Sequence, residues 1–277
     1  MCYSRTWHTL TTLPNGKVLA TGGSGSGSSG AQSTAELYNP ITRTWNITKS
    51  MSDIRQWHKA SLLNNGKVLI TGGTTGGVYG LSSVELYDPL TETWTILRNM
   101  SSPRIDHTAS VLKDGRVLVV GGSPGECMLK TAELYNPKTK TWTLTGNMTH
   151  DRAGHTATVL KNGKVLVTGG TNGGTPELYD PLTGNWTLTG EMNMPRTEHT
   201  ASLLKNGKVL ITGGLYNGVP TTSAELYDPL TGTWNTTDST HYSRYIHIAC
   251  TLLNGEVLVS GGGSVEANSG NTEFYYP

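Results

Sequence analysis

The chain contains six copies of one short pattern, and this repetition limits the possible folds more than any other feature. Each copy begins with Arg-x-x-His, and successive arginines are 44 to 50 residues apart. A repeat of about 20 to 50 residues is typical of solenoids, propellers and other arrays, so each copy should form one supersecondary unit. The six pairs are Arg5/His8, Arg55/His58, Arg104/His107, Arg152/His155, Arg196/His199 and Arg244/His247.

Within each copy, the residues predict four antiparallel strands. A stretch such as 199–204 is followed by Asn-Gly or Asp-Gly, the strongest short-range signal for a two-residue hairpin. The next run, 208–214 in that copy, is too apolar to be half exposed and predicts a buried strand that ends at a glycine pair. A variable loop, a third strand at 224–229 and a fourth strand opened by Trp234 complete the copy. Four such strands make a propeller blade.

Composition agrees with one turn-rich β domain. The 277 residues could form two average domains, but all-β chains of this length also form one. Glycine is abundant, at 35 residues, and phenylalanine occurs once, which disfavours long packed helices. We therefore predict an all-β fold: a six-bladed β-propeller of four-stranded antiparallel blades in a single domain, 1–277. The expected blades are approximately 5–54, 55–103, 104–151, 152–195, 196–243 and 244–277.

The sixth copy is shorter than the others. It reaches Tyr275-Tyr276-Pro277 before any tryptophan strand, and Met1–Arg5 aligns with the loop 192–196, so that segment is not an outer strand. The last blade should lack its outer strand and leave an unpaired edge near Thr272–Tyr276. We expect a monomer, with pairing of two copies through this edge as the alternative.

The repeated glycine pairs, the tyrosine in the third strand and the tryptophan seven residues after it resemble kelch repeats. The most similar subset is the one found in the central domain of galactose oxidase, and the resemblance covers the whole chain. It implies a propeller but no particular activity, because the family includes oxidases, epimerases, lyases and pure interaction modules. The glycine pairs are 22–23, 72–73, 121–122, 169–170, 213–214 and 261–262.

Residues that recur in every blade are interpreted as scaffold. A ring of six histidines could bind a metal, but side chains of an inner strand alternate toward the two neighbouring blades, so we expect packing and hydrogen bonding between blades. The repeated arginines and glutamates should form neutral pairs or cap loops, although an arginine near a loop can also donate to a ligand. No helix follows the glycine pairs, so they are not phosphate loops. The glutamates are Glu36, Glu85, Glu133, Glu177, Glu225 and Glu273.

Ligand binding is expected where the blades differ, in the loops around the mouth of a central funnel. The two positions before each histidine carry aromatic residues in three blades and acidic residues in two, and this arrangement suits sugar stacking or capture of a peptide with a basic or apolar residue. The alternative is that these large side chains pack between blades. The candidate binding residues are Trp7, Trp57, Tyr245, Asp106 and Glu198, with Arg5, Arg55 and Arg244, and with Tyr79 and Tyr216 from the loops after the glycine pairs.

Charge and cysteine content exclude several classes of partner and cofactor. With 21 basic and 20 acidic residues, the net charge of +1 gives no global attraction to nucleic acid or an anionic membrane. No apolar run approaches a membrane span, and Met1–Arg5 is too short and polar for a signal peptide. The three cysteines lack zinc-site spacing, so no metal or cofactor is predicted. Five glycosylation sequons are about what chance yields, so the compartment stays open, with an extracellular one slightly favoured.

Three functional hypotheses remain. The preferred one is a non-catalytic scaffold that presents loops to a protein or glycan. The second is a carbohydrate-active enzyme resembling galactose oxidase or sialate epimerases. The copper oxidase needs a tyrosine linked to cysteine and two histidines at non-equivalent positions, but Cys127 has no tyrosine beside it in the sequence and only His150 and His241 lie outside the repeated set. The third hypothesis is an idealised or recently amplified propeller without specialised activity.

Overall fold

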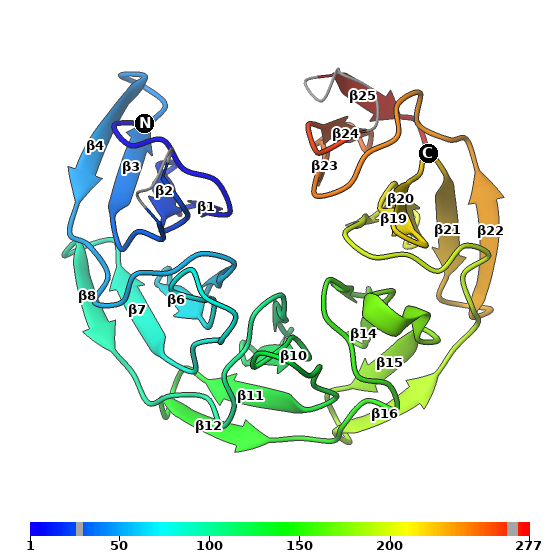
Figure 1. The fold of residues 1–277 in the computed structure, drawn as a ribbon, viewed down its shortest axis with the longest axis horizontal. Coiled ribbons are helices and arrows are strands. Elements are labelled where there is room, and N and C mark those ends of the chain that lie inside the picture. The colour runs from blue at the N-terminus through cyan, green and yellow to red at the C-terminus, as the bar shows by residue number, and fades with distance from the viewer. Residues whose placement is uncertain (26–29, 265–270) are drawn as a thin grey trace. The chain divides into compact units, whose positions relative to one another are not determined.

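The structure, a computed structural model, describes residues 1–25, 30–264 and 271–277. It confirms an all-β, six-bladed propeller of four-stranded antiparallel sheets whose last blade has three strands. Within these residues there is no α-helix, only one turn of 3₁₀ helix, η2 (Thr171–Gly173). The chain divides into two compact units, unit one (Met1–Thr145) and unit two (Gly146–Pro277), each with three blades. Figure 1 shows the four strands of blade one, β1 to β4, side by side in sequence order.

Unit one contains blades one to three. Blade one consists of β1 (Thr9–Thr12), β2 (Val18–Thr21), β3 (Ala35–Asn39) and β4 (Thr44–Thr48). Blade two consists of β5 (Lys59–Leu62), β6 (Val68–Thr71), β7 (Val84–Asp88) and β8 (Thr93–Ile96). Blade three consists of β9 (Thr108–Val111), β10 (Val117–Val120), β11 (Ala132–Asn136) and β12 (Thr141–Leu144).

Unit two contains blades four to six. Blade four consists of β13 (Thr156–Val159), β14 (Val165–Thr168), β15 (Glu177–Asp180) and β16 (Asn185–Leu188). Blade five consists of β17 (Thr200–Leu203), β18 (Val209–Thr212), β21 (Ala224–Asp228) and β22 (Thr233–Thr237), and its loop holds a small hairpin, β19 (Leu215–Tyr216) and β20 (Val219–Pro220). Blade six consists of β23 (Ile248–Thr251), β24 (Val257–Ser260) and β25 (Thr272–Tyr275). No helix formed by the described residues has the length and apolar character needed to cross a membrane.

The strand register defines two edges of each blade. In blade one, Thr9 pairs with Thr21, Thr21 with Ala35, and Ala35 with Thr48. The loop that leads into the inner strand and the loop after the glycine pair therefore share one edge, here called the loop edge, as predicted. The Asn-Gly hairpins and the turns between third and fourth strands lie at the opposite edge, the turn edge. Isolated bridges such as Thr6 to Ser24 join the two loops at the loop edge.

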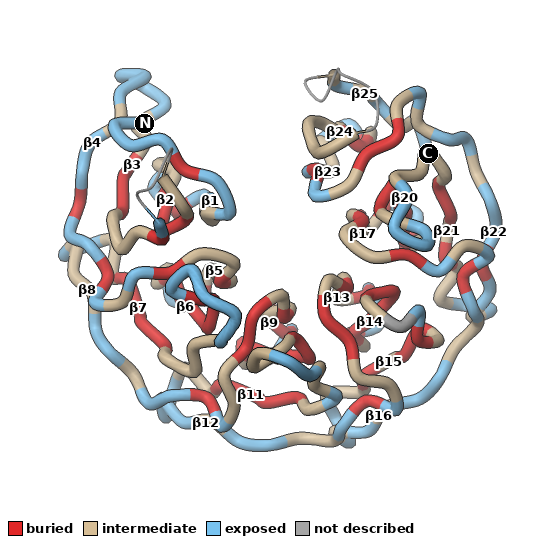
Figure 2. Tube along the Cα trace, viewed as in Figure 1, coloured by how far each residue is buried: buried red, intermediate tan, exposed pale blue. Residues whose placement is uncertain are grey.

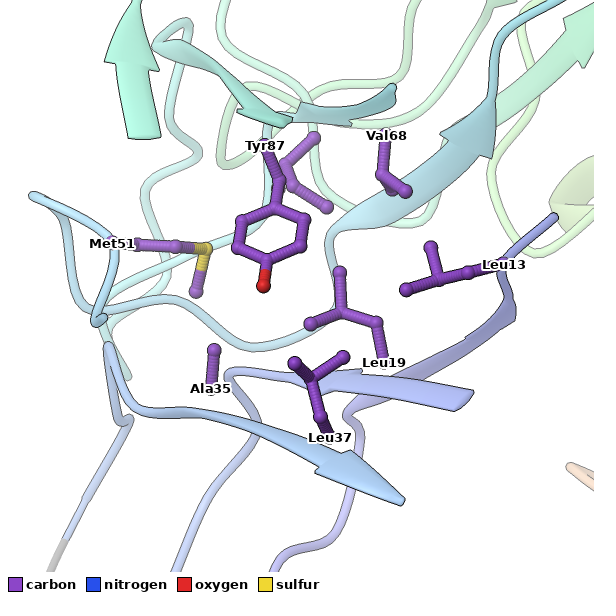
Figure 3. Packing of buried hydrophobic residues seen from close by; sticks show 8 residues of the cluster. Leu13, Leu19, Ala35, Leu37, Met51, Val68 and Tyr87 are labelled. Carbon is purple, nitrogen blue, oxygen red and sulfur yellow. The ribbon is translucent and has the colours of Figure 1, made fainter. Parts of the chain in front are cut away.

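The hydrophobic core lies between neighbouring blades. The second strand of each blade is the most deeply buried element, and β6, β10, β14 and β18 are buried along their whole length (Figure 2). Figure 3 shows Leu19 and Leu37 of blade one facing Val68 and Tyr87 of blade two. Burying a side chain of this size stabilises the fold by about 1.5–3 kcal/mol. Contact between blades, and not only pairing within a sheet, therefore holds each unit together.

The tryptophan of the outer strand contacts both its own blade and the segment that follows the outer strand of the preceding blade. Its tryptophan packs on the tyrosine of the third strand, and the ring centroids are 4.8–5.2 Å apart in five blades. The indole Nε1 of Trp94 donates to the carbonyl of Lys49 at 2.6 Å, and Trp234 donates to the carbonyl of Gly190 at 2.8 Å. Trp142 and Trp186 make equivalent bonds.

Blade six ends at its third strand. β25 pairs only with β24, and no fourth strand is paired with it in the part of the chain that the structure describes. Phe274 is half exposed and Tyr276 is mostly exposed there. The predicted edge at Thr272–Tyr276 is confirmed as an edge, whereas pairing of two copies through it stays a prediction.

Candidate functional site

The repeated arginine and glutamate form an ion pair in every blade, and the pair is buried in blades one to five. In blade two, Arg55 reaches Glu85 at 3.0 Å and also donates to the carbonyl of Gly72 at 2.8 Å. Glu85 accepts hydrogen bonds from the backbone N–H groups of Ser52 and Asp53, in the loop that leads into the inner strand. This network fixes the loop to its blade, which confirms the scaffold interpretation. The six pairs, separated by 2.5–3.0 Å, are Arg5/Glu36, Arg55/Glu85, Arg104/Glu133, Arg152/Glu177, Arg196/Glu225 and Arg244/Glu273.

Three of these arginines were also candidates for ligand binding. Arg5, Arg55 and Arg244 are at most 7% exposed. The NH1 and NH2 groups of each donate hydrogen bonds to oxygen atoms of its own blade. In this structure they support the loops around the candidate site. A direct role of these guanidinium groups in ligand binding stays a prediction.

In four blades the repeated histidine bridges to the preceding blade, as predicted. His58 Nε2 lies 3.0 Å from Thr9 Oγ1 and 3.1 Å from Thr21 Oγ1 of blade one. Burial and the nearby charge of Arg55 hold the pKa of His58 well below its usual value. Burial and the charge of Arg196 lower the pKa of His199 to about 3, and burial and the charge of Arg244 lower that of His247 to about 4. These imidazoles are neutral hydrogen-bonding groups near pH 7.

The glycine pair lets the next blade approach closely. Gly22 has a φ of +58°, and a Cβ there would lie 2.5 Å from the carbonyl oxygen of Arg55 and 2.8 Å from the ring of His58. Gly23 donates its N–H to the same carbonyl at 2.9 Å. Only a residue without a side chain fits this contact, so the glycines have the backbone role expected for them.

The residue before each histidine has a left-handed backbone. The φ values lie between 52° and 64° in all six blades. For L-residues other than glycine this conformation costs about 1–2 kcal/mol, and bulky residues rarely adopt it. Glycine occurs at this position only in blade four, so local backbone preference does not explain the side chains in the other five. The six residues are Trp7, Trp57, Asp106, Gly154, Glu198 and Ile246.

Hydrogen bonds between blades hold this position in place. Trp57 donates its backbone N–H to the carbonyl of Trp7 at 3.2 Å. In unit two, Glu198 donates to Gly154 and Ile246 donates to Glu198, both at 3.0 Å. The left-handed backbone at this position was not predicted from the sequence. The available signal was Gly154, because a glycine at a position that holds tryptophan elsewhere suggests a positive φ.

The structure brings Trp7 and Trp57 together at the loop edge of unit one. Their ring centroids are 5.4 Å apart at an interplanar angle of 56°, and Trp7 is 47% exposed. Trp57 Nε1 and Gln56 Oε1 are buried and have no hydrogen-bond partner among the described residues. Asp106 occupies the equivalent position of blade three and is half buried. This aromatic pair is the largest rigid apolar feature among the candidate residues.

Tyr79 reaches solvent from the loop after the glycine pair of blade two. Its side chain is 70% exposed, and its ring lies beside Gly125 of blade three, where a Cβ would be 3.1 Å from Cδ1. Both residues lie in loops at the loop edge of unit one. Tyr79 therefore adds a second exposed aromatic group to that edge.

The remaining candidates belong to unit two. The ring of Tyr245 lies against Gly263, where a Cβ would be 2.5 Å from Cε1. The carboxylate of Glu198 lies against Gly154, where a Cβ would be 2.6 Å from Oε1. Tyr216 is 40% exposed in the hairpin β19–β20. The ring of Tyr245 therefore contacts a glycine of its own blade, whereas the carboxylate of Glu198 contacts a glycine of the preceding blade.

Comparison with protein families agrees with the repeat geometry. The family model of the KLHDC2/KLHL20/DRC7 Kelch-repeats domain matches residues 7–187, more than half of the chain. The Kelch motif model matches residues 196–237. The chain belongs to the kelch-repeat family. No curated protein sequence matches it significantly.

Kelch-repeat propellers are commonly protein-interaction scaffolds. In this kelch propeller, the repeated arginine, glutamate, histidine and glycine pair make contacts within or between blades. Within residues 1–25, 30–264 and 271–277, no group of three or more His, Cys, Asp and Glu side chains is arranged to hold a metal ion.

Proposed function

We propose that this kelch propeller is a non-catalytic binding module whose unit one binds a segment of a partner protein at the loop edge. The observation that carries the proposal is the contact between Trp7 and Trp57. Two indoles lie together, one of them half exposed, on backbone positions where glycine fits best. Backbone strain of this kind tends to gather at functional sites.

The pair has the properties of a binding hot spot. Tryptophan is enriched among residues that dominate protein interfaces, because it buries a large area and loses little conformational freedom. The hydrogen bond between the backbones of Trp57 and Trp7 already fixes the pair, so binding costs less ordering entropy. Trp57 Nε1 and Gln56 Oε1 are buried next to this pair without a hydrogen-bond partner among the described residues. Such groups are uncommon in folded proteins, so they also favour a binding site here.

The surrounding charges define the partner's chemistry. Asp106 and the exposed Glu126 lie in loops of the same edge and unit as the tryptophans. An apolar or aromatic side chain would pack on the indoles, and a neighbouring lysine or arginine would face the carboxylates and the indole face. We therefore propose a peptide segment that carries an apolar residue beside a basic one.

Selection from a displayed peptide library tests this proposal. Peptides that bind the native protein should carry an apolar or aromatic residue next to Lys or Arg. Their affinity should fall at least tenfold for the double variant Trp7→Ala/Trp57→Ala, because the contact area is lost, while the melting temperature stays nearly unchanged. Binding is measured by calorimetry and stability by thermal unfolding.

Leu90→Ala is the matched control, because Leu90 is 93% exposed but lies at the turn edge of the same unit. This variant should bind like the native protein. Failure to select any peptide, full binding by the double variant, or binding of glycans alone would contradict the proposal. A large fall in the melting temperature of the double variant would show that the indoles serve packing between blades.

A further inference from the structure

We propose that the outer rim of this propeller is N-glycosylated, with one glycan on each of the five four-stranded blades. The outer rim is defined here as the outer strand of a blade and the three residues that follow it. Each of these five segments contains one asparagine of an Asn-x-Ser/Thr sequon, the acceptor for N-linked oligosaccharides. The five asparagines are Asn46, Asn99, Asn147, Asn185 and Asn235.

The number of sequons is what chance yields, but their placement on the structure is not. Three of the asparagines lie in the outer strands β4, β16 and β22, and the other two follow the outer strands β8 and β12 by three residues. All five are exposed. The asparagines in the hairpins, in the third strands and in the loops do not begin a sequon. Sequons therefore occur once in each four-stranded blade and only on the outer rim.

Duplication of one ancestral blade does not explain this placement. Asn185 lies one residue before the tryptophan of its outer strand, whereas Asn46 and Asn235 lie one residue after it. Asn99 and Asn147 lie five residues after it. A copied motif would keep one position in the repeat, but here three different positions place an asparagine on the same part of the blade. The property that the five sites share is therefore their location on the outer rim.

The fold uses the side chains of other asparagines but not those of the outer rim. In the hairpins, Oδ1 of Asn15 and of Asn65 accepts the backbone N–H two residues later, both at 3.1 Å. Asn39 and Asn136 accept the same bond at the ends of their third strands, both at 3.0 Å. The carboxamides of the outer rim make no hydrogen bond within residues 1–25, 30–264 and 271–277. Their Nδ2 amides are thus available for modification.

The outer rim has two properties that a glycan would offset. The outer strands are the edges of their sheets, and such edges favour pairing with other chains. Four of them also expose a large apolar side chain within three residues of the asparagine, and these side chains are 54–70% exposed. They are Ile47, Ile96, Leu144 and Leu188. A glycan is bulky and hydrophilic, so one on each blade would shield both the strand edge and the apolar side chain.

The modification is a group transfer from an activated oligosaccharide. The donor is a lipid-linked oligosaccharide pyrophosphate, and the catalyst is the oligosaccharide transferase of a secretory pathway. The Nδ2 nitrogen of asparagine attacks the anomeric carbon of the sugar and forms a new N–C bond. The bond from that carbon to the pyrophosphate oxygen breaks, so the lipid pyrophosphate leaves. The amide proton passes to a base of the transferase. The proposal therefore places this chain in a secretory pathway.

Site-resolved mass spectrometry of the natural protein tests this proposal. The protein is purified with an antibody from the cells that produce it and is digested with and without a peptide-N-glycosidase, which converts a glycosylated asparagine to aspartate. We expect conversion at all five asparagines of the outer rim and none at Asn39 or Asn136, which are the internal controls. An asparagine that is never modified would overturn the proposal for its blade, and unmodified peptides at all five sites would overturn it altogether.

The shielding role is tested on the chain secreted by insect cells behind a cleavable leader. A variant with Asn→Gln at all five sites keeps the amides but has no sequon. We expect light scattering to show that the native protein stays monomeric at concentrations at which this variant self-associates, because its strand edges and apolar side chains are uncovered. Asn39→Gln, which leaves every sequon intact, is the matched control and should stay monomeric. Equal behaviour of the native protein and the fivefold variant would contradict the shielding role, and a secreted native chain without glycans would overturn the proposal.

Discussion

Lowering the pH from about 6.5 to about 4.5 is expected to remove most of the protein's stability. The pKa of His58 is held well below its usual value, and those of His199 and His247 are lowered to about 3 and about 4, mainly by burial. The unfolded chain takes up these protons near its pKa of about 6.5, whereas the folded chain does not. The contribution of each histidine is therefore complete above that pH and is lost as the pH falls.

The size of this effect follows from the imidazoles whose pKa values are lowered most. His199 and His247 each contribute about 1.4 kcal/mol per pH unit in this window, so the two contribute about 3 kcal/mol per unit. Two units of acidification then cost about 5 kcal/mol, and His58 adds to the loss in the same direction. This is comparable to the whole stability of a typical domain of about 5–15 kcal/mol.

Denaturant unfolding at several pH values between 7 and 4.5 measures this dependence. The variant His199→Gln should reduce the slope by about 1 kcal/mol per pH unit, because the unfolded chain then takes up one proton fewer. A free energy of unfolding that stays constant between pH 6.5 and 5 would contradict the assignment of these histidines as neutral links between blades.

Removing the charge of one buried glutamate is the second change with a large expected effect. Glu133→Gln should destabilise the protein by about 3–5 kcal/mol, because it leaves the guanidinium of Arg104 buried without its counter-ion. Both side chains are at most 1% exposed. Ser101 would also lose a charged acceptor for its backbone N–H, which now lies 2.8 Å from Glu133.

Blade six offers a matched control for this substitution. Glu273→Gln makes the same chemical change, but the side chain of Glu273 is 12% exposed at the open edge, so water can solvate Arg244 more readily. Urea unfolding of the two variants should show a clearly smaller loss for Glu273→Gln. Equal losses, or a loss below about 1 kcal/mol in blade three, would show that the buried pairs do not hold the loops.

The scaffold could be predicted from the sequence because its parts recur. The hairpins, the buried second strand and the edge at Thr272–Tyr276 follow from local patterns that depend on neighbours a few residues away. The pairing of arginine with glutamate and the placing of histidine between blades followed from their repetition, since residues at equivalent positions of every blade must serve the fold.

The candidate site could be predicted only in part. The positions before each histidine were correctly located at the loop edge, but their left-handed backbone depends on bonds such as Trp57 to Trp7, which join residues fifty positions apart. Likewise, the ring of Tyr245 lies on Gly263, a contact set by the glycine's missing side chain and not by spacing. The hydrogen bonds from the indoles to backbone carbonyls, such as that of Trp234 to Gly190, could not be predicted either, because no local sequence pattern identifies a backbone acceptor.

Two adjacent residues of blade two separate the role of the repeated residues, which hold the blades, from the binding role that we propose for the tryptophan before the histidine. Trp57→Ser and His58→Ala are compared for melting temperature and for affinity to the selected peptides. We expect Trp57→Ser to keep the melting temperature and lose binding, because its indole is contact surface. His58→Ala should lower the melting temperature, because its bonds to Thr9 and Thr21 are lost, yet bind while folded. The opposite pattern, with Trp57→Ser unstable but competent to bind, would contradict this division of roles.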